Sequence, residues 1–236
     1  MKLTERQLYH YMRCPIYYLG AYEYGLTPVE QPSMNKLLNK VAHAFCSRLA
    51  AQVVPSKKDV QKMWDRVCGE NKEYITDKRV VDGITALMQM YRWAEDKQLM
   101  IGSTNIPYSI VFNQEHPIEL TGTIDIVAVT PDKKMELLVF DFDRRAPDRA
   151  VMDMKLKYTM DAFAFKKLMN KDIGVHIHHV HTAQDFFTYR ANDDFLRLES
   201  TVVAIGKCIE NKVFFPRENT FCSSCDMKNY CRAWYK

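Results

Sequence analysis

Four cysteines have a spacing that fits a metal centre, and they come from the two ends of the chain. Cys222, Cys225 and Cys231 form a C-x2-C-x5-C pattern in the tail, and the fourth is Cys14 near the start. A cage of four thiolates suits either a tetrahedral zinc ion or an iron–sulfur cluster. One shared centre would tie the two ends of the chain together. The alternative is that the tail cysteines are unrelated thiols, which their clustering in a polar segment disfavours.

A second set of residues that could do chemistry is acidic and begins in the middle of the chain. Asp125 falls between Ile124 and Ile126, in a stretch rich in β-branched residues. Side chains alternate between the two faces of a strand, so Asp125 would point away from both isoleucines. Because an unpaired carboxylate is costly to bury, this acid is either hydrogen bonded at a sheet edge or present for a function.

The next expected strand carries two further acids, Asp141 and Asp143. Two residues apart on a strand, they would project from one face about 6.5–7 Å from each other. Together with Asp125 they would place three carboxylates at the ends of two neighbouring strands. Carboxylate oxygens are ligands that Mg²⁺ or Mn²⁺ prefers, and such a site can activate water and neutralise a reacting phosphodiester.

Basic side chains could complete this site. His43 lies opposite the apolar stripe of its expected helix, on a polar face that also carries two lysines. It is either a solvated histidine or a metal ligand. In a later expected helix, Lys155 and Thr159 lie one turn apart and face the same way, whereas Lys157 falls on a different side.

A cluster of histidines stands apart from these positions, at His176, His178, His179 and His181. On a strand, His176 and His178 would share one face. The pattern is typical of a metal site, but no acid or cysteine accompanies it. We therefore expect this cluster to be mainly structural.

Local patterns predict a mixed α/β body that would position these residues. Helices are expected over residues 4–13, 33–54, 57–70, 79–98, 149–170 and 192–209, with Thr4 and Ser33 as N-caps of the first two. The helix 33–54 carries an apolar stripe with a 3.6-residue period. Strands are expected where Ile, Val, Phe and Thr are dense, over residues 106–113, 118–130, 135–143, 175–182 and 185–190. The first three strands read as a meander.

Length and composition predict one compact domain. The chain has 236 residues, 47% of them hydrophobic, and only eight glycines and nine prolines. We divide it into a mainly helical part (1–100), a core (101–190) and a C-terminal helix with the cysteine tail (191–236). The net charge of +4 permits nucleic-acid binding without arguing for it.

The expected location is the cytoplasm, with no membrane association. The first residues contain no apolar signal region, and no run approaches the ~20 apolar residues of a membrane span. Seven cysteines in such a chain fit a reducing compartment, where thiols bind metals rather than form disulfides. The three cysteines outside the quartet, Cys46, Cys68 and Cys208, are expected to be buried small apolar residues.

Taken together, these motifs resemble the RecB-like branch of the PD-(D/E)XK nuclease superfamily, across almost the whole chain. The resemblance is to the iron–sulfur members, namely the CRISPR-associated RecB-like exonucleases and the nuclease domain of AddB. It is carried by the cysteine quartet and by Tyr9-x4-Cys14-Pro15, His43, Gly122-x-Ile124-Asp125 and Asp141-x-Asp143.

The resemblance implies a fold, two metal centres and a substrate. The fold would be a restriction-endonuclease-like mixed sheet flanked by helices, with both chain ends joined at the four-cysteine cluster. Cys14, Cys222, Cys225 and Cys231 would hold a structural [4Fe-4S] cluster, with zinc as the alternative. His43, Asp125 and Asp141 would bind the catalytic Mg²⁺ or Mn²⁺. Gly122 would give a tight approach before the acidic strand, and the helix 149–170 would line the DNA cleft.

Two departures from the family pattern bear on activity. The family expects a lysine where this chain has Asp143, and an amide-bearing residue where Thr159 stands one turn before Phe163. Either Asp143 works with metals alone, as acids do in some restriction enzymes of the superfamily, or the lysine has moved to Lys155 on the neighbouring helix.

These departures leave two functions open. One is a metal-dependent DNA nuclease, acting as an exonuclease on single strands or DNA ends within a DNA-processing complex. The other is a catalytically impaired nuclease-like module that binds DNA or partner proteins.

Overall fold

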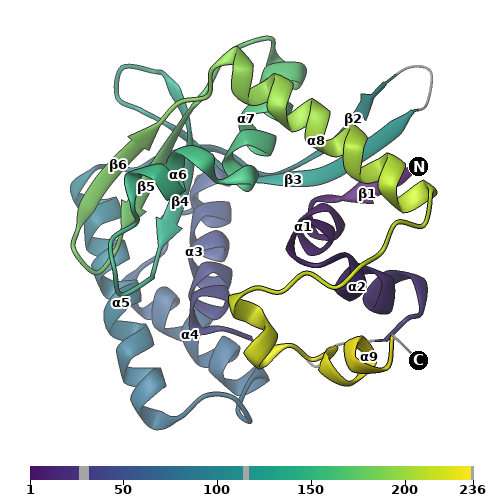
Figure 1. Cartoon of the computed structure of the whole chain (residues 1–236). Coiled ribbons are helices and arrows are strands. Elements are labelled where there is room, and N and C mark those ends of the chain that lie inside the picture. The colour runs from purple at the N-terminus through teal and green to yellow at the C-terminus, as the bar shows by residue number, and fades with distance from the viewer. Residues whose placement is uncertain (27–31, 114–116, 235–236) are drawn as a thin grey trace. The chain divides into compact units, whose positions relative to one another are not determined.

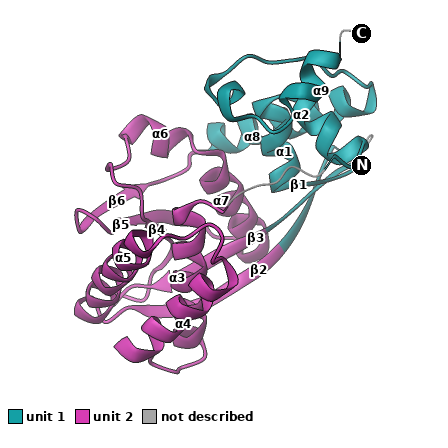
Figure 2. Cartoon of the chain, turned by 90° about the horizontal axis from the view of Figure 1, so that it is seen from below, with its two compact units in different colours: residues 1–30, 108–122, 192–236 teal, residues 31–107, 123–191 magenta. Residues whose placement is uncertain are grey.

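The computed structural model describes residues 1–26, 32–113 and 117–234, and the chain forms two compact units (Figure 2). Unit 1 comprises residues 1–30, 108–122 and 192–236, and unit 2 comprises residues 31–107 and 123–191. Each unit therefore combines segments that are distant in sequence, and neither follows the chain-order division expected from the sequence. Within the described residues, no helix combines the length and apolar character needed to span a membrane.

Unit 1 begins with a short strand that leads directly into a capped helix. Strand β1 (Lys2–Thr4) pairs in parallel with the start of β3 (Ile118–Val129), from Lys2↔Glu119 to Thr4↔Thr121. Thr4 then caps α1 (Glu5–Arg13), because its side chain accepts from the Gln7 amide while the Gln7 side chain accepts from the Thr4 amide. The predicted helix start and cap are confirmed, whereas the three-residue strand before it was missed.

The rest of unit 1 is helical and encloses aromatic residues. Tyr11 is buried in α1, and its hydroxyl donates to the Val213 carbonyl at 2.5 Å, which holds the segment after α8 against α1. Tyr18 stacks on Phe214 with ring centroids 6.2 Å apart. The elements involved are α2 (Pro15–Tyr18), η1 (Leu19–Glu23), α8 (Asn192–Glu210), η2 (Thr220–Ser224) and α9 (Lys228–Ala233).

Two long strands contribute residues to both units, and a glycine is required where they meet within unit 1. Strand β2 (Met100–Phe112) pairs with β3. A Cβ atom added at Gly122 would lie 2.3 Å from the hydroxyl oxygen of Tyr108, so no larger residue fits without displacing this ring. The close approach expected at Gly122 is therefore made by a tyrosine of β2.

Unit 2 contains a mixed sheet, which confirms the expected mixed α/β class (Figure 1). The end of β3 pairs antiparallel with β4 (Met135–Asp141), β4 pairs in parallel with β5 (Gly174–His179), and β5 pairs antiparallel with β6 (Gln184–Thr188). The parallel connection from β4 to β5 runs through two helices, α6 (Arg149–Met154) and α7 (Leu156–Met169).

Three helices of unit 2 share one hydrophobic core with the sheet. They are α3 (Met34–Ala50), α4 (Lys57–Glu70) and α5 (Asp77–Asp96), close to the ranges predicted from the sequence. Ser33 caps α3 by accepting from the Lys36 amide, as expected. The core contains Trp64 of α4, Met90 of α5 and Phe140 of β4, all at most 2% exposed.

Two predicted elements differ from the structure: one helix is interrupted, and one strand ends two residues early. The helix predicted over 149–170 is broken at Lys155, whose backbone is extended (φ −67°, ψ 115°) and precedes α7. Lys155 and Thr159 therefore do not share a helix face, and Thr159 is buried and accepts from Arg190 Nε at 2.8 Å. The strand predicted over 135–143 ends at Asp141, so Asp143 lies beyond it and outside the strand alternation.

The histidine cluster has acidic companions that the sequence did not reveal. His178 Nδ1 lies 2.8 Å from Asp185 of β6, and His176 Nδ1 lies 3.2 Å from Glu136 of β4. The expectation that no acid accompanies these histidines is wrong, because strand pairing brings the acids from neighbouring strands. Trp93 stacks on the His178 ring at 4.1 Å, so this imidazole is enclosed by packing on one side.

We expect this cluster to make stability depend on pH. Burial lowers the pKa of His178 below its ordinary value of 6.5, an effect that its hydrogen bond to Asp185 only partly offsets. The unfolded chain then takes up a proton that the folded protein resists, so the free energy of unfolding should fall as the pH drops below 6.5. Thermal midpoints measured against pH should fall less steeply in His178→Gln, with the exposed His181→Gln as control. Equal slopes in all three proteins would contradict the prediction.

Candidate functional site

Three of the predicted acids lie around one cavity in unit 2. This cavity, here called the acidic cavity, has a volume of about 300 Å³, and Asp125, Asp141 and Asp143 contribute to its wall. Asp125 comes from β3, Asp141 is the last residue of β4, and Asp143 follows two residues later. Residues of α3 and α7 complete the wall, namely Asn35, Asn39, Lys157, Tyr158 and Asp161, together with Lys155 just before α7 and apolar residues of β3 and β4.

Asp143 is held at a fixed corner of the acidic cavity. Its backbone amide donates to the Asp141 carboxylate at 3.0 Å, which bends the chain away from the end of β4. Its carbonyl accepts from His179 Nε2 at 2.7 Å, and its carboxylate accepts from the Asn35 amide of α3. Asp143 therefore borders the cavity because the chain bends after Asp141, and not because the two residues share one face of a strand.

His43 does not line the acidic cavity, but its ring contacts the backbone of Asp125. Its Nε2 lies 3.2 Å from the Asp125 carbonyl oxygen. Because a carbonyl only accepts, Nε2 carries the proton in this contact. Across the described parts of the chain, no three His, Cys, Asp or Glu side chains are arranged to hold a metal ion. The ligand set of His43, Asp125 and Asp141 stays a prediction.

Lys157 contacts one of the predicted acids. Its Nζ lies 3.6 Å from Asp125 Oδ2, 2.9 Å from Asp161 Oδ1 and 2.7 Å from the Thr123 carbonyl oxygen. The Lys157 side chain is 23% exposed, that of Asp161 9% and that of Asp125 57%. The partly buried ammonium group of Lys157 thus pairs with the buried carboxylate of Asp161 and lies beside the exposed carboxylate of Asp125.

Sequence reasoning missed this role for Lys157. It placed Lys155 and Lys157 on different sides of one continuous helix, and the break at Lys155 removes that premise. The spacing of Lys157 and Asp161 was an available signal, since residues four apart on a helix face each other. No glycine or proline marks the break itself.

Lys155 also lines the acidic cavity, although its closest contacts are with a tyrosine. Its Nζ lies 3.4 Å from the Tyr158 hydroxyl and 4.8 Å from the centre of that ring. Burial raises the pKa of Tyr158, and the nearby ammonium group opposes this shift. Tyr158 therefore presents a protonated hydroxyl group to the cavity at neutral pH.

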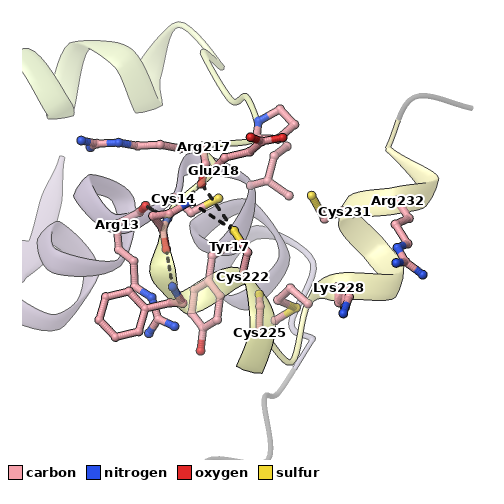
Figure 3. A pocket seen from close by; sticks show the side chains of 15 residues that line it. Arg13, Cys14, Tyr17, Arg217, Glu218, Cys222, Cys225, Lys228, Cys231 and Arg232 are labelled. Atoms are coloured by element: carbon pink, nitrogen blue, oxygen red, sulfur yellow. Dashed lines mark hydrogen bonds between the residues drawn. The ribbon is translucent and has the colours of Figure 1, made fainter.

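The cysteine quartet lines a second cavity, which lies in unit 1 (Figure 3). This cysteine cavity has a volume of about 400 Å³, and all four side chains, from Cys14, Cys222, Cys225 and Cys231, contribute to it. Burial raises the pKa of the Cys231 thiol, and charge on the other three cysteines raises it further. The Cys231 thiol thus lies within electrostatic reach of each of the other three cysteines.

Local structure explains how the tail returns to Cys14. Cys14 ends α1 and precedes Pro15, which suits the first position of α2 because that amide needs no partner. Arg217 donates to the Met12 carbonyl at 2.6 Å, and Asn219 donates to the Arg13 carbonyl at 3.0 Å. These two bonds hold the tail against the end of α1.

The three cysteines outside the quartet differ in burial. Cys46 is fully buried in the core of unit 2, as expected, and burial strongly raises the pKa of its thiol. Cys68 and Cys208 are half-buried. None of the three lines the cysteine cavity.

Comparisons with known proteins agree with the fold. A family model described as the PD-(D/E)XK nuclease superfamily matches residues 2–232. A crystal structure described as a "putative exonuclease" from Eubacterium rectale is similar with a TM-score of 0.57 and 11% identity, covering 98% of this chain and 87% of that chain. The crystal structure of SSO0001 has a TM-score of 0.43 and 14% identity, covering 84% of this chain and 94% of that chain. No curated protein matches the sequence.

Proposed function

The chain belongs to the PD-(D/E)XK nuclease superfamily, and we propose that it is a metal-dependent deoxyribonuclease acting as an exonuclease on single strands or DNA ends. The observation that carries this proposal is the acidic cavity, where four carboxylates and two lysines surround one opening. Opposite charges at such short range suit a site that binds a cation beside a phosphodiester.

The residues present fit a divalent metal by their chemistry. Asp125 and Asp141 offer carboxylate oxygens to the acidic cavity, and His43, whose ring contacts the Asp125 carbonyl, would add an imidazole nitrogen. Mg²⁺ or Mn²⁺ bound there would polarise the phosphodiester and lower the pKa of a bound water. Lys157 would orient the Asp125 carboxylate and stabilise negative charge on the phosphate, and Asp143 would act as a third acid beside the metal.

A digestion assay tests the proposed activity. End-labelled single-stranded and duplex DNA should be degraded with Mg²⁺ or Mn²⁺, with mononucleotides as early products, and chelation with EDTA should stop the reaction. Early fragments of intermediate length would instead indicate internal cleavage. If neither metal supports cleavage of either substrate, the proposal of an active nuclease is wrong.

The second candidate is a catalytically impaired module that binds DNA or partner proteins. It is favoured by one feature, the acid at position 143 where the family expects a lysine, whose carboxylate is engaged by Asn35. Its signature would be DNA binding that weakens with salt in the absence of any cleavage. In either case we propose a cytoplasmic protein of a DNA-processing complex.

For the cysteine cavity we propose a structural [4Fe-4S] cluster, with zinc as the alternative, as in the iron–sulfur members of the RecB-like branch. A cavity of about 400 Å³ bordered by four thiols has room for a polynuclear centre. Among the described residues no three of these thiols are arranged to hold a metal ion, so the proposal is supported only by the cysteine spacing and by the cavity that the four side chains share.

Removing one cysteine should separate the two interpretations of the tail. Anaerobically purified wild-type protein should be brown and contain iron. Cys222→Ala should lose the colour, and its thermal midpoint should fall by several degrees, because a bound centre stabilises the fold that holds it. The half-buried Cys68→Ala lies in unit 2 and serves as the matched control. Colourless protein with stoichiometric zinc would place the site in the zinc class, and unchanged stability in Cys222→Ala would contradict a structural role.

A further inference from the structure

A third cavity adjoins the acidic cavity and shares two of its residues. This arginine cavity has a volume of about 560 Å³ and lies in unit 2 between α3, α5 and the segment after β4. Asn35 and Asp143 line both cavities. A molecule that fills the arginine cavity therefore lies directly beside the acidic cavity.

The walls of the arginine cavity combine an apolar floor with a rim that carries charges of both signs. The floor is formed by Leu38, Ala86 and Phe142, each at most 3% exposed. The rim carries Arg79 and Arg144 together with the carboxylates of Asp82 and Asp143. A cavity of this size is in the range of small-molecule sites, and an apolar floor with a few convergent polar groups is typical of them.

Both arginines can reach a ligand at little cost. The Arg144 side chain is 83% exposed and lies 3.4 Å from Asp82, which is itself half exposed. Arg79 donates to the Tyr74 carbonyl at 3.0 Å through Nη1. Exposed ion pairs contribute little to stability, so Arg144 can exchange Asp82 for a phosphate, and the guanidinium group suits phosphate oxygens.

The histidine cluster also reaches this cavity. His181 follows β5 and lines the arginine cavity. His179, two residues earlier, donates to the Asp143 carbonyl and so fixes the corner that separates the two cavities. The end of β5 thus supports both the predicted acid site and its neighbour.

We propose that the arginine cavity binds the nucleotide next to the phosphodiester held in the acidic cavity. Arg79 and Arg144 take its phosphate, and its base and sugar cover the floor of Leu38, Ala86 and Phe142. The inference rests on the proposed function, because it assigns the acidic cavity to the reacting phosphate. This subsite would fix the register of the bound DNA strand. It would also favour single-stranded DNA, whose unpaired bases are free to enter the cavity.

Nucleotides with one and two phosphates test this subsite without any cleavage. Calorimetry with Ca²⁺ should show that thymidine 3′,5′-bisphosphate binds more tightly than thymidine 5′-monophosphate, because the second phosphate reaches the arginines. Arg79→Ala or Arg144→Ala should lower affinity for the bisphosphate roughly tenfold or more, because each variant loses a hydrogen bond between two charged groups. Both variants should bind the monophosphate about as the wild type does.

Matched controls remove the same charge outside the cavity. Arg92 is exposed on the same helix as Arg79, and Arg145 follows Arg144, and neither lines the arginine cavity. Arg92→Ala and Arg145→Ala should retain the preference for the bisphosphate. Circular dichroism checks that each variant is folded.

Two outcomes overturn the inference, and both are distinct from failure of the proposed function. Equal losses in Arg79→Ala and Arg92→Ala would indicate general charge attraction rather than a site. Equal affinity of the wild type for the two nucleotides would show that no second phosphate is bound. A wild type that binds the bisphosphate selectively but cleaves nothing would contradict the nuclease and support the subsite.

Discussion

Asp125→Asn should abolish metal-dependent cleavage while leaving the fold intact. The substitution keeps the size of a side chain that is 57% exposed, so little packing is lost. It removes the charge that faces both the acidic cavity and Lys157, whose ammonium group keeps its contacts with Asp161 and the Thr123 carbonyl. Loss of one metal-binding carboxylate should lower the rate by a factor on the order of 10³, since metal-based charge stabilisation contributes several kcal/mol.

This result needs a control with the same loss of charge. Asp132 is exposed in the turn between β3 and β4, where it pairs with Lys134 outside the acidic cavity, and Asp132→Asn should cleave at the wild-type rate. Single-turnover digestion gives the rate, calorimetry gives metal affinity, and thermal midpoints verify folding. Wild-type cleavage by Asp125→Asn would remove Asp125 from the metal site and with it the main support for the proposed reaction.

The sequence predicted those parts of the fold that depend on local signals. Thr4 and Ser33 were identified as caps because a side-chain oxygen at a helix start needs only its neighbours in sequence. The break at Lys155 had no such signal, since no glycine or proline accompanies it. Strand β1 was missed because three residues are too few to show a period, and its partner lies over a hundred positions away.

The same distinction applies to the predicted site. Asp125 was found because an acid between two buried isoleucines stands out on a strand. Asp143 was placed by an alternation that ends at Asp141, and it borders the cavity because the chain bends there. The partners of His176 and His178 come from the pairing of β5 with β4 and β6, which no spacing within one segment reveals.

Lys157→Met should cause the second large loss of activity, and it distinguishes between two lysines of the acidic cavity. Lys157 contacts Asp125, whereas Lys155 contacts Tyr158. If Lys157 stabilises the reacting phosphate and orients Asp125, its removal should slow cleavage about 10²-fold or more, in the range of positioned acid–base groups. Lys155→Met should then slow cleavage only a few-fold.

The loss in Lys157→Met must be separated from a loss of stability. Asp161 is 9% exposed at its side chain, so removing Lys157 leaves a buried acid without this partner and should lower the thermal midpoint. The double variant Lys157→Met/Asp161→Asn removes both charges and should recover the midpoint but not the rate. Rates are therefore compared at a temperature at which every variant is folded.

Asp143→Lys provides the rescue experiment for this lysine. Position 143 borders the same cavity, so a lysine introduced there in the Lys157→Met background should restore part of the rate. A large loss in Lys155→Met together with full activity in Lys157→Met would instead assign the displaced lysine to position 155. Full activity in both lysine variants and a sharp loss in Asp143→Ala would show that the three acids work with the metal alone, because no ammonium group would then be needed beside the phosphate.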